Sequence, residues 1–74
     1  EETVGRVHDA IVLRYGLSPR EVEVTALLLR GRSIPYICDE LFIAKSTAQT
    51  HVRHIYEKAL VNNRQELLDK VEAR

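Results

Sequence analysis

The segment from Ala44 to Ala59 constrains the fold of this chain most, because it divides into an apolar and a polar side when it is wound as a helix. The apolar side consists of Ala48, Val52, Ile55, Tyr56 and Ala59. The polar side consists of Ser46, Gln49, Thr50, Arg53 and Glu57. One side can therefore join a core, while the other offers hydrogen-bonding groups that suit base edges and phosphates.

Helical spacing continues through the rest of the chain, and no stretch alternates in the manner of a strand. The clearest helix start is at Ser18, which precedes Pro19 at the first helical position and Glu21 three residues after the cap, as in a capping box. Asn63 and Glu66 give a second start of the same kind. We therefore predict an all-α fold with five helices, over residues 2–15, 18–30, 34–41, 45–59 and 63–72.

The length of the chain and its few candidate catalytic or metal-binding side chains argue against an enzyme or a metal site. A chain of 74 residues forms one small domain, with no room for both a core and an enzyme cleft. We therefore predict no catalytic residues, no cofactor and no small-molecule ligand. His51 and His54 have no third ligand near them, so no metal site is predicted. The single cysteine, Cys38, is expected to be a buried thiol.

The sequence contains no apolar run of the roughly 18 residues that a membrane span needs. We therefore expect this domain to lie in the cytoplasm, although its parent protein could be attached to a membrane. The chain also contains no methionine. On that ground we expect it to be a piece of a longer protein or a processed one.

Basic side chains concentrate on and after the divided helix, although the whole chain has a formal net charge of +0. Within residues 43–64, Lys45, Arg53, Lys58 and Arg64 face one acidic residue, Glu57. A local basic patch can position a phosphate backbone even when the total charge is neutral, so double-stranded DNA is the predicted partner. The alternative is that these charges are ordinary solvated surface.

Four short motifs follow one another along residues 17–71. They are Leu17-Ser18-Pro19-Arg20-Glu21, Gly31-Arg32-Ser33, Ser46-Thr47-x-x-Thr50-His51-Val52-x-x-Ile55-Tyr56-x-Lys58, and Arg64-Gln65-Glu66-Leu67. Their order and spacing resemble the C-terminal DNA-binding domain of LuxR/FixJ-type bacterial transcription regulators. No single motif is decisive, but the ordered set is specific.

The resemblance implies a four-helix, LuxR-type helix-turn-helix bundle over residues 17–74, with 34–41 and 45–59 as the helix-turn-helix. Residues 1–16 would then be an additional N-terminal helix or a connector from an upstream sensor or receiver domain. In this family the C-terminal helix commonly makes dimer contacts. A homodimer is therefore expected, with an interface formed by Leu67, Leu68 and Val71.

The resemblance also implies which side chains meet DNA. The family's base-contacting positions fall on Gln49, Thr50 and Arg53. Its phosphate-contacting positions fall on Lys45, Ser46 and Thr47, with Lys58 and Arg64 as weaker candidates. For Arg53, the alternative is an ion pair with Glu57 one turn later.

This chain departs from the family pattern at the start of the divided helix. The family usually has Val-Lys where this chain has Ala48-Gln49, and glutamine favours adenine where lysine meets phosphate or guanine. It usually has Ser, often followed by Pro, where this chain has Ala44-Lys45. Alanine is a poor N-cap, so Ser46 could cap the helix one turn later.

The links before and after the divided helix contain large apolar residues. We expect Phe42 and Ile43, before the divided helix, to turn inward. Leu60, after that helix, replaces a glycine of the family pattern. A leucine in a left-handed C-cap is strained, so we expect this helix end to be rearranged.

Two other functions stay open. One is a sigma-factor region that reads a promoter element through a similar helix-turn-helix. The other is a protein-interaction module that has lost DNA binding and dimerises through Leu67, Leu68 and Val71, in keeping with the neutral total charge.

Overall fold

The computed structural model describes residues 14–72 as a bundle of four helices. The helices are α2 (Pro19–Leu29), α3 (Ile34–Leu41), α4 (Lys45–Ala59) and α5 (Arg64–Glu72). No strand occurs within residues 14–72, which confirms the predicted all-α class. The predicted N-terminal helix, over 2–15, lies outside the described residues except for Arg14 and Tyr15, which are helical.

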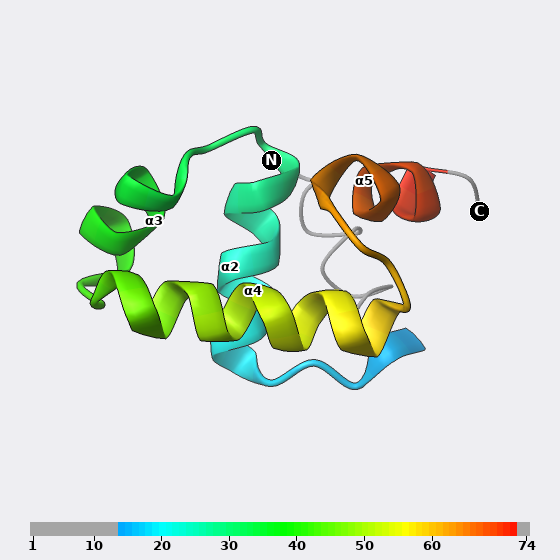
Figure 1. Cartoon of the computed structure of the whole chain (residues 1–74), viewed down its shortest axis with the longest axis horizontal. Helices are drawn as coiled ribbons and strands as arrows, with labels where there is room; N and C mark the ends of the chain where they lie inside the picture. Colours follow the sequence, from blue (N-terminus) through cyan, green and yellow to red (C-terminus); the bar gives the residue numbers. More distant parts are fainter. Residues whose placement is uncertain (1–13, 73–74) are drawn as a thin grey trace.

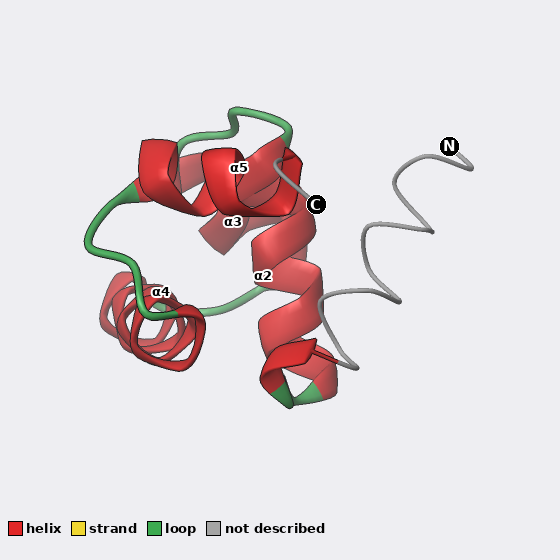
Figure 2. Cartoon of the chain, turned by 90° about the vertical axis from the view of Figure 1, so that its right-hand side faces the viewer, coloured by secondary structure: helices red, strands yellow, loops and turns green. Residues whose placement is uncertain are grey.

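The longest helix, α4, forms one side of the bundle (Figure 1). α2 crosses behind α4, α3 lies beside the N-terminal half of α4, and α5 lies toward its other end (Figure 1). Seen nearly along its axis, α4 lies to the left of α2, against which it packs, and α5 lies above α4 (Figure 2). This arrangement leaves a long side of α4 without a covering helix among the described residues.

The core is built from all four helices. Val24 and Leu28 of α2, Ile37 of α3, Ile55 of α4 and Leu67 of α5 are each 0–1% exposed. Burying an aliphatic side chain of this size stabilises a fold by about 1.5–3 kcal/mol. A small domain needs each of these contributions, because it buries only roughly 60% of the surface of its unfolded chain.

The structure confirms both predicted helix starts. At α2, the Glu21 backbone N–H donates to Ser18 Oγ at 3.2 Å, and the Ser18 N–H donates to Glu21 Oε1 at 2.9 Å. At α5, the Glu66 N–H donates to Asn63 Oδ1 at 2.9 Å. The Glu66 carboxylate reaches one residue further back than a capping box requires, to the N–H of Asn62 at 2.8 Å.

Two residues of the predicted dimer interface, Leu67 and Val71, lie in the core of this domain. Leu67 is 0% exposed and Val71 is 8% exposed, and both belong to the core of this domain. α5 uses its apolar stripe to pack against α2. Leu68, the third predicted interface residue, is half-buried.

The links at the two ends of α4 contain the only non-glycine residues with positive φ in the described part of the chain, Phe42 (φ 56°) and Leu60 (φ 60°). The prediction that Phe42 turns inward is wrong, because its side chain is 93% exposed. Ile43 is half-buried. The prediction that the end of α4 is rearranged is also wrong. Leu60 keeps the left-handed cap, and the following Val61 N–H donates to Tyr56 O at 2.9 Å.

The strain at Leu60 gives a first prediction. A left-handed conformation costs an L-residue roughly 1–2 kcal/mol, and the 82% exposed side chain of Leu60 recovers little of it by packing. We expect Leu60→Gly to raise the free energy of unfolding by about 1 kcal/mol in urea titration, because glycine adopts this conformation without strain. As a control, Gln65→Gly in α5 should lower it by about 0.5–1 kcal/mol. A less stable Leu60→Gly variant would contradict the argument.

Candidate nucleic-acid interface

The structure confirms that α4 has one buried and one exposed face. Ala48, Ile55 and Ala59 are 0–1% exposed and form the inner face. The predicted base-contacting residues lie on the outer face, where Gln49 and Arg53 are exposed and Thr50 is half-buried. Residues four apart on a helix are neighbours, so Gln49 and Arg53 present adjacent polar groups along one line.

Arg53 is free to meet a partner. The alternative for this residue was an ion pair with Glu57, but Arg53 and Glu57 form no ion pair in the structure. Glu57 is itself exposed at the far end of the same face. Arg53 is exposed, and its guanidinium has no ion-pair partner among the described residues.

The N-terminal end of α4 is open. Ala44 is the N-cap, with φ −72° and ψ 158°, and no side chain caps the helix. Ser46 lies inside the first turn, so the alternative in which it caps a later start is wrong. Lys45, Ser46 and Thr47 are all exposed there. A helix start offers free N–H groups and the positive end of the helix dipole, and both favour an anion.

The two weaker phosphate candidates have partners inside the domain. Lys58 Nζ lies 2.7 Å from Glu21 Oε1 and donates to Gly16 O at 3.4 Å. Arg64 Nη2 donates to Arg32 O at 2.7 Å. These contacts join segments 32–42 residues apart in the sequence. Lys58 and Arg64 therefore hold distant segments of the bundle together, and they are weaker phosphate candidates than Lys45.

Glu21 is the partner that the sequence analysis missed, because only its local role as a cap is visible in the sequence. Its side chain is 6% exposed, and His54 Nδ1 lies 3.7 Å from its second carboxylate oxygen. Burial raises the pKa of Glu21, but the hydrogen bonds from Lys58 and Ser18, together with the charge of Lys58, outweigh burial. The pKa of Glu21 is therefore lower than its ordinary value of 4.5.

This lowered pKa predicts how stability depends on pH. Because the pKa of Glu21 is lower in the folded chain than in the unfolded chain, its carboxylate stabilises the fold above the unfolded value. That stabilisation is lost as the pH falls through the folded value. We expect the free energy of unfolding, measured in urea from pH 7 downward, to fall less steeply below pH 4.5 in Glu21→Gln than in the unmodified chain.

At pH 7, Glu21→Gln should also lower the free energy of unfolding by about 1–3 kcal/mol, because it replaces a charged hydrogen-bond acceptor. The matched control is Glu23→Gln on the same helix. Glu23 is 56% exposed and pairs with Arg20 at the surface, so its loss should change stability by under about 1 kcal/mol. Equal pH profiles for the two variants would rule out the role of Glu21.

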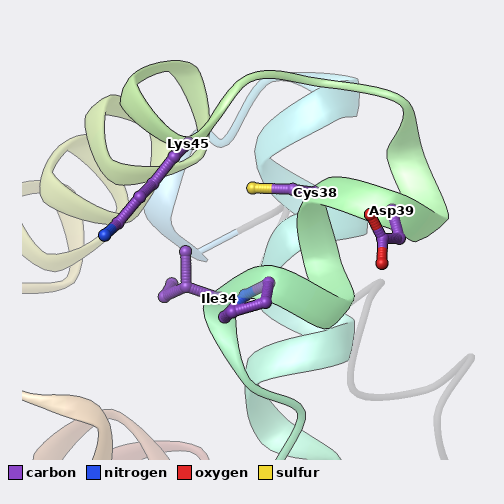
Figure 3. A pocket seen from close by; sticks show the side chains of 5 residues that line it. Ile34, Cys38, Asp39 and Lys45 are labelled. Carbon is purple, nitrogen blue, oxygen red and sulfur yellow. The ribbon is translucent and has the colours of Figure 1, made fainter.

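A shallow hollow lies where α3 meets the start of α4 (Figure 3). It is lined by Ile34, Pro35, Cys38, Asp39 and Lys45. Cys38 is half-buried and turns its sulfur toward α4, so the prediction of a buried thiol is wrong (Figure 3). In residues 14–72, no group of three or more potential ligands could hold a metal ion. None of the described helices is long and apolar enough to cross a membrane.

Two helices joined by a short turn, α3 and α4, with a third helix crossing behind the second, define a helix-turn-helix domain. Residues 15–71 match the family described as bacterial regulatory proteins, luxR family, and the chain belongs to this family. The match confirms the resemblance found in the sequence. It also confirms a regulatory domain in place of an enzyme.

Regulators from two bacterial genera are similar to this chain. The probable transcriptional regulatory protein NarL of Mycobacterium tuberculosis (strain ATCC 25618 / H37Rv) is 50% identical over 48 residues, which cover 65% of this chain and 22% of that protein. The HTH-type transcriptional regulator MalT of Yersinia pestis (strain Pestoides F) is 38% identical over 56 residues, which cover 76% of this chain and 6% of that protein. The chain thus spans a small part of either relative. No solved structure matches it.

Proposed function

We propose that this domain binds double-stranded DNA sequence-specifically, with α4 in the major groove, as the DNA-binding part of a bacterial transcription regulator. The observation that supports this most strongly is the free outer face of α4, where Gln49 and Arg53 are exposed beside Thr50. The 15 residues of α4 extend about 22 Å. A helix fits the major groove, which is about 12 Å wide.

The chemistry of the outer face suits base edges. A guanidinium such as that of Arg53 can donate two hydrogen bonds to O6 and N7 of guanine. The amide of Gln49 can donate to and accept from N6 and N7 of adenine. Thr50, half-buried between them and the core, can offer a hydroxyl or a methyl group. These three residues would supply the sequence preference.

The open start of α4 suits the phosphate backbone. Lys45, Ser46 and Thr47 are exposed around the first turn, where the helix leaves its N–H groups uncapped. A phosphate placed here would meet an ammonium, two hydroxyls and the positive end of the helix dipole. Such contacts set the register of the protein on DNA, while base contacts specify the sequence.

The relatives support a role within a larger protein. Both are named as transcriptional regulators, and this chain matches 22% of one and 6% of the other. We infer that an upstream sensor or receiver part of the parent protein presents two copies of this domain, in the cytoplasm, to DNA. Two copies would then read half-sites about one helical turn, or roughly 34 Å, apart. Of the predicted dimer residues, only Leu68 keeps part of its surface for such a contact.

The test is a selection from a pool of random DNA duplexes at low salt, using two copies of the chain joined by a flexible linker. Two copies are used because joining them raises the affinity for paired half-sites by effective concentration. An enriched motif with two related half-sites is the expected result. Retention without a motif would contradict sequence-specific reading. No retention would leave the protein-interaction module as the better explanation.

Replacement of Arg53 tests the base contact. We expect Arg53→Ala to weaken binding to the selected site by about 1–3 kcal/mol and to relax the preference at one base pair. The measurement is competition between the selected site and its single-base variants. Arg20→Ala is the matched control, since Arg20 is exposed at the far end of α2. An unchanged base preference in Arg53→Ala would remove this residue from the reading face.

Replacement of Lys45 tests the backbone contact. We expect Lys45→Ala to weaken binding to all sequences alike, because a phosphate contact carries no base information. The slope of log affinity against log salt concentration should become shallower by about one. Titration of a mixed-sequence and a selected duplex at several salt concentrations measures both effects. A loss confined to one sequence would place Lys45 on a base instead.

A further inference from the structure

Arg32 and Tyr36 form a pair at the start of the helix-turn-helix. Neither residue belongs to the proposed base-contacting or phosphate-contacting set. The guanidinium carbon of Arg32 lies 4.8 Å from the centre of the Tyr36 ring, a cation–π distance. Tyr36 belongs to the first turn of α3 and is 39% exposed. Arg32, in the loop before α3, is half-buried. The ring therefore holds the Arg32 guanidinium in place, while part of Arg32 remains exposed to solvent.

Among the described residues, the guanidinium of Arg32 has no acceptor. Its Nε is buried and has no hydrogen-bond partner in the described part of the chain. The ion pairs of residues 14–72 do not include it either. Its backbone is held firmly, because Arg32 N–H donates to Leu27 O at 3.0 Å and Arg32 O accepts from Arg64 Nη2 at 2.7 Å. The terminal N–H groups of the same guanidinium are not among the buried atoms, and they have no acceptor among the described residues, so they can donate to an external anion.

The charges along α3 indicate which end of it an anion would approach. Arg30 and Arg32 precede the helix, whereas Asp39 and Glu40 lie in its last turn, both exposed. A polyanion is attracted to the first end and repelled from the second. In helix-turn-helix complexes the first helix crosses the DNA backbone while the second lies in the groove. The DNA backbone would therefore pass most favourably at the start of α3, where Arg30 and Arg32 attract its phosphates.

We propose that Arg32, positioned by the ring of Tyr36, binds a phosphate of the DNA backbone. This inference rests on the proposed function, because it assumes that α4 lies in the major groove. The guanidinium suits the task, since its planar N–H groups can donate two parallel hydrogen bonds to phosphate oxygens. Stacking on the ring covers a face of the guanidinium and leaves the N–H groups at its edge. Tyr36 acts as a positioning residue.

The test is the salt dependence of DNA binding by the 74-residue chain. Fluorescence anisotropy would follow its binding to a mixed-sequence duplex of about 20 base pairs, since each phosphate contact contributes about 0.9 to the slope of log affinity against log salt. The variant is Arg32→Gln, which removes the charge and keeps a long side chain. Arg20→Gln is the matched control, because it makes the same change of net charge at the far end of α2, where Arg20 is exposed.

We expect Arg32→Gln to flatten the slope by about 0.9, which is roughly a threefold smaller change in affinity between 50 and 200 mM salt. Arg20→Gln should leave the slope unchanged. Urea titration would show whether each variant is folded. A folded Arg32→Gln variant with an unaltered slope would overturn the inference, while the slope change of Lys45→Ala would still support the proposed function. Absence of salt-sensitive binding in the unmodified chain would overturn both.

A second variant tests the part played by Tyr36 and does not depend on the fold of the first. Tyr36→Leu removes the aromatic ring but leaves the charge of Arg32 in place. We expect it to weaken binding at low salt about two- to threefold, and to cause no further loss when combined with Arg32→Gln. Additive losses in the double variant would show that Tyr36 acts independently of Arg32, which would overturn the pairing.

Discussion

The packing of α4 across α2 is the contact on which the other features of the domain depend. The inner face of α4 contains Ala48 and Ala59, which are 0–1% exposed and small enough to let neighbouring helices approach closely. With Ile55 between them, this face is fully used by the core. The polar side of the same helix is then committed to the surface, because a helix that packs on one side must expose the other. The exposed polar face of α4, which we propose as the reading face, is thus a consequence of how the core is built.

The two ends of α4 are treated differently. At its C-terminal end, Lys70 Nζ donates to Ala59 O at 2.7 Å, and Lys58 pairs with the buried Glu21. Cations therefore cover the negative end of the helix dipole. At its N-terminal end no side chain caps the helix, and Lys45 adds a further positive charge. Side chains of the domain itself meet the C-terminal end of α4, whereas its N-terminal end remains open to an external anion.

Features encoded by neighbouring residues could be predicted from the sequence, whereas features that depend on distant partners could not. Helices α2, α3 and α4 lie within one residue of their predicted bounds, because caps and apolar spacing are local. The partners of Lys58 and Arg64 lie 37 and 32 residues away, and no local pattern encodes them. The apolar stripe of α5 suited either a core or a dimer, and its spacing alone could not separate the two.

The internal use of basic side chains limits how strongly one copy of the domain can hold DNA. Of the four basic residues in the segment 43–64, Lys58 and Arg64 are engaged within the bundle, so Lys45 and Arg53 supply the free charge there. Few phosphate contacts give a weak and only mildly salt-dependent affinity. Two joined copies gain affinity by effective concentration without any new contact, by a factor of roughly 10²–10⁴. Under the proposed function, control over whether two copies act together would therefore be control over DNA binding.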